Sequence, residues 1–193
     1  MKIKFDVRKH IVKNIVLYIA GILAIPVITC YSIHFKNLAK DYEKFSVVSG
    51  AAITESNTLK SIIEKDGSIK EASIYARAYD EQFYVYMESR ISTADIVILP
   101  NVEGSLSPYL SSAYIELTSS DIFYNDSNYQ VDNKHFGVKL NSYTSVSSQF
   151  TFNADTDYFL FIRKSSVHIK HWNDTSKTDL VYNILKDYLN EAI

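Results

Sequence analysis

Residues 94–99 read Ala-Asp-Ile-Val-Ile-Leu, and this stretch decides the expected fold. An apolar run of this length, which is uninterrupted after Asp95, is typical of a strand buried on both faces of a sheet. Before it, residues 45–52 have the pattern of a strand, and residues 56–66 have a helical pattern that ends before Gly67. Residues 72–79 then alternate like a second strand, and residues 80–91 have a second helical pattern. This β-α-β-α-β order predicts the α/β class, with a mixed, mostly parallel sheet and helices on both faces.

The two predicted helices each have one apolar face. Ser56 or Asn57 can cap the first helix, and Asp80 can cap the second. The apolar positions at helical spacing are Leu59, Ile62 and Ile63 in the first helix, and Tyr84, Met87 and Ile91 in the second. Both faces are expected to pack on the sheet.

The second half of the chain has a different pattern. It predicts a helix at residues 107–117, followed by strands or extended ribbons at residues 129–140, 145–152 and 158–162. A last helix is expected at residues 178–192. Its apolar stripe consists of Val181, Ile184, Leu185, Tyr188 and Leu189.

The N-terminal part has the pattern of a membrane anchor. Residues 1–14 carry five basic side chains and one acidic one, and residues 14–35 carry no formal charge. A helix of that length, rising about 1.5 Å per residue, spans a hydrocarbon core of roughly 30 Å. The basic residues place the N-terminus in the cytoplasm. We therefore expect a cytoplasmic segment at residues 1–14, a single-pass transmembrane signal anchor at 15–35, a stalk at 36–44 and an extracellular α/β domain at 45–193.

The apolar run fits a cleaved signal, a lipid-modified segment or a buried soluble helix less well. A cleaved secretory signal needs small residues at its exit, which residues 28–30 do not provide. Lipid modification of Cys30 would require a better preceding sequence than Val27 and Thr29, although the sequence leaves this question open. A buried soluble helix is disfavoured by the basic residues at one end. Because Cys30 is the only cysteine, an intramolecular disulfide is excluded.

Charge and motifs argue against several functions. The net charge is −2, and residues 45–193 carry 12 basic and 19 acidic side chains, so binding to nucleic acid through phosphate contacts is not expected. The sequence lacks the common nucleotide-binding and serine-nucleophile motifs. His168 and His171, with Asp174 nearby, do not provide a third strong ligand for a metal. We expect no enzyme, no metal and no cofactor.

The order of motifs resembles that of extracellular solute-binding proteins of ABC transporters. The resemblance rests on residues 94–99, on Glu116-Leu117-Thr118 and on the segment at 132–138 (DNKHFGV), and it covers about residues 45 to 140. It implies a bacterial protein with one periplasmic-binding-protein-like lobe. The chain is too short for two such lobes, and Lys139 stands where the family usually has proline. The resemblance therefore implies a single-lobe, membrane-anchored relative.

In open α/β sheets, ligands and partners bind beyond the carboxyl ends of the strands, close to helix N-termini. The residues expected at this edge are Ser49, Gly50, Asn57, Tyr79, Asp80, Glu81, Tyr84, Asn101 and Glu103. Tyrosine rings there can anchor a partner or stack on a ligand. The alternative is that Asn57 and Asp80 only cap helices and that Asn101 only forms a turn.

The sequence thus predicts a membrane-anchored extracellular binding or accessory subunit that contacts a membrane transport complex. The alternative function is direct reception of a small polar solute, such as a sugar. A cell-wall enzyme is the least favoured function, because no acid, base and nucleophile converge in the sequence.

Overall fold

The computed structural model describes residues 12, 14–54, 57–102, 110–169 and 180–190. The chain divides into two compact units, Met1–Ala39 and Lys40–Ile193. The first unit contains helix α2 (Ile15–Asn37), which has 23 residues and includes Pro26. Over the residues that the structure describes, no helix combines the length and apolar character needed to cross a membrane. The structure therefore does not support the predicted transmembrane helix, which stays an expectation from the sequence.

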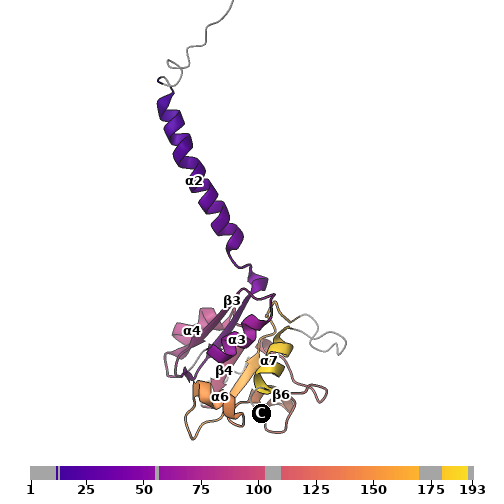
Figure 1. Ribbon diagram of the computed structural model, residues 1–193. Coiled ribbons are helices and arrows are strands. Elements are labelled where there is room, and N and C mark those ends of the chain that lie inside the picture. The colour runs from indigo at the N-terminus through magenta and orange to yellow at the C-terminus, as the bar shows by residue number, and fades with distance from the viewer. Residues whose placement is uncertain (1–11, 13, 55–56, 103–109, 170–179, 191–193) are drawn as a thin grey trace, which may run out of the picture. The chain divides into compact units, whose positions relative to one another are not determined.

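The second unit is built on a six-stranded mixed sheet (Figure 1). The strand order is β3 (Glu71–Ala76), β1 (Lys44–Ser49), β4 (Ile96–Pro100), β8 (Tyr158–Ile162), β6 (Lys134–Lys139) and β5 (Tyr129–Val131). Strands β3, β1 and β4 are parallel, whereas β8, β6 and β5 join through antiparallel ladders. The predicted mixed α/β sheet is confirmed. Only two of its five strand pairings, β1 with β3 and β1 with β4, are parallel, so the sheet is less parallel than predicted.

Helices cover both faces of this sheet, as predicted. One face packs against α3 (Asn57–Lys65) and α7 (Leu180–Asn190), and the other packs against α4 (Phe83–Ile91) and α5 (Leu110–Ala113). Strand β4 is buried along its whole length. Its side chains alternate between the two cores, with Ile96 and Ile98 on the α3 side and Val97 and Leu99 on the α4 side. The run at residues 94–99 is thus the central buried strand that its composition predicts.

Two predicted strands in the second half were wrong in part. The ribbon predicted at residues 129–140 is a hairpin of β5 and β6, and its turn residues Asp132 and Asn133 have φ of 50° and 60°. Such positive φ values fit a tight two-residue turn between antiparallel strands. Residues 145–152 form mostly a helix, α6 (Thr144–Gln149), followed by the short strand β7 (Phe150–Thr151), which pairs with β2 (Ala52–Ile53). The remaining short element is a 3₁₀ turn, η1 (Asp41–Glu43).

Gly137 in β6 has no room for a side chain. A Cβ atom placed there would lie 2.7 Å from Cε1 of Phe161 and 3.0 Å from Cβ of Phe159 on the neighbouring strand β8. Both distances are shorter than ordinary van der Waals contact. Glycine at this position lets the two aromatic rings pack against the sheet in the α4-side core.

Candidate functional site

The ends of β1, β3 and β4 meet at the carboxyl edge around Gly50. The Gly50 N–H donates to the Ile98 carbonyl (2.7 Å), and the Tyr79 N–H donates to the Gly50 carbonyl (2.8 Å). A Cβ atom on Gly50 would lie 3.0 Å from Cδ of Pro100 and 3.6 Å from Cβ of Tyr79. The space beside Gly50 is therefore filled by the protein's own Pro100 and Tyr79.

Ser49 is directed into the protein. Its hydroxyl donates to the Ala51 carbonyl (3.1 Å) and accepts from the Ala51 N–H (3.0 Å), and the residue is fully buried. These two bonds hold the turn that follows β1. Ser49 therefore shapes the edge without presenting its hydroxyl to solvent.

Asp80 belongs to a small charged network in front of α4. Its carboxylate accepts from the Gln82 N–H (3.0 Å) and pairs with the Arg77 guanidinium (2.8 Å). The hydrogen bond from Arg77 holds the pKa of Asp80 below its ordinary value. The Arg77 guanidinium also lies over the Tyr86 ring, 4.4 Å from its centroid. The turn before α4 is thus fastened to the end of β3 through Arg77.

Three aromatic rings pack together behind this network. Tyr79 lies 5.3 Å from Phe83 and 6.1 Å from Tyr84 between ring centroids, and the contact with Tyr84 is edge-on. Burial raises the pKa of Tyr79 and, more strongly, that of Tyr84. Both hydroxyls therefore remain protonated at neutral pH. The two tyrosines are only partly buried, so this cluster extends from the α4-side core to the surface.

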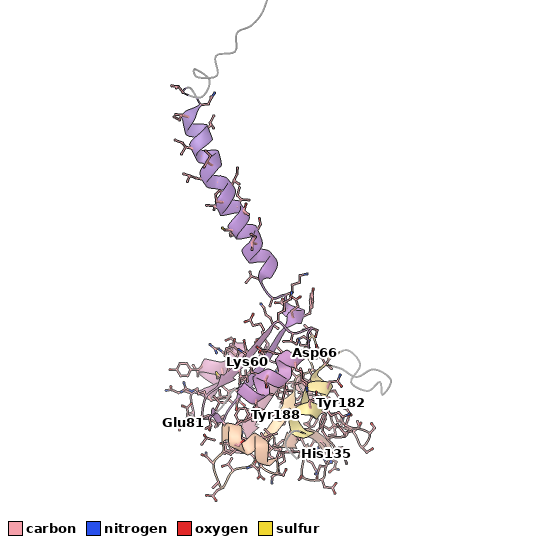
Figure 2. All side chains as sticks on the ribbon, in the orientation of Figure 1. Lys60, Asp66, Glu81, His135, Tyr182 and Tyr188 are labelled. Atoms are coloured by element: carbon pink, nitrogen blue, oxygen red, sulfur yellow. The ribbon has the colours of Figure 1, made fainter. Side chains whose placement is uncertain are left out.

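The other predicted site residues are more scattered. Glu81 and Asn101 are exposed, and Glu81 lies at the periphery of the domain (Figure 2). The Asn101 N–H donates to the Asp157 carbonyl (2.7 Å), which ties the end of β4 to the loop before β8. Asn57 is the first residue of α3, and Glu103 and the alternative cap Ser56 lie outside the described residues.

The structure adds exposed apolar residues that the predicted set lacks. Val85 and Tyr86, on the outer side of α4, are 77% and 57% exposed, and Val102 after β4 is also exposed. Val85 lies off the buried stripe of Phe83, Met87 and Ile91. The sequence contains one signal for this surface, namely that the apolar residue Val85 lies outside the apolar stripe of its helix. We call Arg77, Asp80, Val85 and Tyr86 the α4 surface.

Two hollows formed by described residues lie elsewhere in the domain. A small hollow of about 180 Å³ is lined by Tyr84 together with Leu99, Tyr114 and Arg163 on the α4-side face of the sheet. A larger hollow of about 530 Å³ lies at the opposite, amino edge, where the parallel strands begin. Of the predicted site residues that the structure describes, none lines the larger hollow.

Metal binding receives no support within the described part of the chain, where no group of three or more possible ligands gathers. The His168 ring approaches the Lys44 carbonyl through Nε2 (2.7 Å) and packs near Phe45. His171 and Asp174 lie outside the described residues. His168 therefore joins the segment after β8 to the start of β1.

Comparison with family models, with curated proteins and with solved structures finds no match to this chain. The resemblance to extracellular solute-binding proteins therefore rests on the sequence motifs at residues 94–99, 116–118 and 132–138 alone.

Proposed function

We propose that this chain is a membrane-anchored extracellular binding or accessory subunit, which contacts a membrane transport complex through the α4 surface and performs no catalysis. The observation that carries the proposal is the exposure of Val85 and Tyr86 on α4, where the Tyr86 ring lies against Arg77 near the carboxyl edge of the sheet. Tyrosine and arginine are enriched at the energetically dominant positions of protein interfaces, and this edge is where open α/β sheets bind their partners.

The anchor is inferred from the sequence around α2. The 22 residues from Asn14 to Phe35 carry no formal charge, and five basic side chains precede them. Leu17, Ile22 and Ile25 have exposed side chains in the described part of α2. A hydrocarbon layer would cover such side chains, and the preceding basic residues favour a cytoplasmic N-terminus.

A protein partner fits the α4 surface better than a small solute does. Ser49 is bonded internally, and Pro100 and Tyr79 fill the space beside Gly50. A small polar ligand needs a concave site with convergent polar groups, and these residues leave little room for one. An exposed tyrosine beside an arginine suits a protein interface. Reception of a solute such as a sugar at this edge remains the alternative function.

The absence of catalysis is part of the proposal. General acid-base or nucleophilic chemistry needs side chains that converge on one reacting position. At the carboxyl edge, two polar side chains that could serve are engaged with the protein: Ser49 with the Ala51 backbone, and Asp80 with Arg77 and the Gln82 N–H.

Photo-crosslinking in intact cells tests the proposed contact. A photoreactive amino acid at Tyr86 should crosslink to an integral membrane subunit of a transport complex, whereas the same probe at Lys60 on α3, on the opposite face of the sheet, should not. Arg77→Ala should weaken the crosslink from position 86, because Arg77 is itself part of the α4 surface that is proposed to contact the partner. Crosslinking that is equal at the two positions, or that captures no membrane transport subunit, would contradict the proposal.

A further inference from the structure

The larger hollow, at the amino edge of the sheet, has the features of a ligand site. Its volume of about 530 Å³ lies within the range of roughly 300–1,000 Å³ that is usual for small-molecule pockets. Four segments far apart in the sequence form its walls, at residues 41–46, 71–75, 92–95 and 165–167. We call it the amino-edge hollow. It lies at the end of the strands opposite to the α4 surface.

A buried carboxylate contributes to the wall of this hollow. Asp95, at the start of β4, is 4% exposed. One of its oxygens accepts from the Ser46 N–H (2.8 Å), and the other accepts from the Ser166 hydroxyl. The Ser166 oxygen accepts in turn from the His168 N–H (3.2 Å). Since a carboxylate has about four acceptor positions, Asp95 is held rigidly and still has acceptor capacity.

Hydroxyl groups make up much of the rest of the lining, beside Phe45, Tyr75 and Val167. Among the described residues, six serine and threonine side chains border the hollow: Ser46, Ser73, Ser92, Thr93, Ser165 and Ser166. Five of these hydroxyls also bond within the protein: those of Ser46, Ser92 and Thr93 donate to backbone carbonyls, that of Ser166 donates to Asp95, and that of Ser165 accepts from Arg163. Their oxygens can still accept a further hydrogen bond, and Ser73 can both donate and accept, so the lining suits a ligand that donates hydrogen bonds. Neutral hydroxyls also do not select a charged ligand. The lining therefore favours a ligand with many hydroxyl groups of its own.

The charges of the hollow argue against an anion. Within the described part of the chain, Lys44 is the only cation in the lining, and its ammonium group lies 3.7 Å from the Asp41 carboxylate. The carboxylates of Glu71 and Asp95 are additional to this pair. A phosphate or carboxylate ligand would meet net negative charge, whereas the hydroxyl groups of a neutral ligand can donate to these carboxylates.

We propose that the amino-edge hollow binds an uncharged, hydroxyl-rich ligand of the saccharide class, with Glu71 and Asp95 accepting hydrogen bonds from ligand hydroxyls and Ser73 completing the polar contacts. This site is separate from the α4 surface. Its occupancy therefore does not depend on whether the chain contacts a transport complex.

Calorimetric titration of the full chain tests this site, in a detergent without a sugar headgroup so that the micelle does not compete. The probes are D-glucose, maltose and N-acetylglucosamine, with inorganic phosphate and propylammonium as charged comparisons. At least one saccharide should bind with a Kd of about 1 mM or tighter, and neither charged probe should bind as well.

Variants locate the binding. Glu71→Ala and Ser73→Ala should each weaken saccharide binding by about threefold or more, as expected for loss of one hydrogen bond. Lys60→Ala and Ser61→Ala, exposed on α3, are the matched controls and should bind like the unmodified chain. Thermal unfolding of all four variants should be unchanged, which separates a binding effect from misfolding. The proposal is overturned if no saccharide binds, if phosphate or propylammonium binds better, or if the hollow variants bind like the controls.

Discussion

Replacing Asp95 by alanine and by asparagine separates two contributions of this buried carboxylate. Alanine removes both hydrogen bonds and leaves the Ser46 N–H and the Ser166 hydroxyl without their acceptor. Each unsatisfied buried group costs about 1–3 kcal/mol. Water entering from the adjacent hollow reduces that cost, so we expect Asp95→Ala to lower the free energy of unfolding by about 2–4 kcal/mol.

Asparagine preserves the two contacts. Its Oδ1 can accept from the Ser46 N–H, and its Nδ2 can donate to the Ser166 oxygen, since that hydroxyl can rotate. We therefore expect Asp95→Asn to change the free energy of unfolding by less than about 1 kcal/mol at neutral pH. Urea unfolding of the full chain in detergent, followed by far-ultraviolet circular dichroism, measures both variants.

The pH dependence gives an independent check. Burial raises the pKa of Asp95 above its ordinary value, so the folded protein binds this proton more tightly than the unfolded chain does. Between the unfolded and the folded pKa, the contribution of Asp95 to stability falls as pH rises, and it is recovered on acidification. Relative to Asp95→Asn, the unmodified protein should therefore gain stability from neutral to mildly acidic pH. A difference that stays constant with pH, or an asparagine variant as unstable as the alanine variant, would refute this account of Asp95.

Three further predictions concern the core and the anchor. Gly137→Ala should lower the free energy of unfolding by about 1–3 kcal/mol, because its Cβ would meet Phe161 at 2.7 Å, and a thermal midpoint equal to that of the unmodified chain would contradict this. Ile98→Asp should prevent folding, because it places an unpaired charge at a fully buried position, and a cooperative unfolding transition in this variant would show that β4 has an exposed face. Cys30→Ser should leave the protein in the membrane fraction, whereas its release would favour a lipid anchor at Cys30.

The sequence predicted the first half of the domain better than the second. At residues 94–99, a nearly continuous apolar run favours a buried strand beside helices, and β4 has that environment. At residues 145–152 (SVSSQFTF), the apolar residues Val146, Phe150 and Phe152 are separated by even numbers of positions, which imitates the alternation of a strand. Val146 and Gln149, three positions apart, are buried on one side of α6, so tertiary packing overrides the local pattern. The turn at Asp132 and Asn133 was missed within the ribbon predicted at residues 129–140, although aspartate and asparagine tolerate positive φ better than other side chains do.

The candidate site was also predictable only in part. The edge that carries Gly50, Tyr79 and Asp80 follows from strand order, which the alternation of elements reveals. The amino-edge hollow could not be predicted, because Asp95 meets Ser166 only after β8 has paired with β4. The hydrogen bonds between the Ser49 hydroxyl and the Ala51 backbone could not be predicted either, since they depend on the direction of one side chain within a turn.

Thiol labelling of intact cells tests the central claim most directly, namely that the α/β domain is outside the cell. In a chain that carries Cys30→Ser, the substitutions Lys60→Cys and Lys4→Cys are introduced separately and exposed to a membrane-impermeant maleimide. Lys60→Cys should be labelled in intact cells, because this position is exposed on α3, on the face of the sheet opposite to the α4 surface, and follows the anchor. Lys4→Cys should react only after the cells are lysed. Labelling of Lys4→Cys in intact cells, with protection of Lys60→Cys until lysis, would contradict the account.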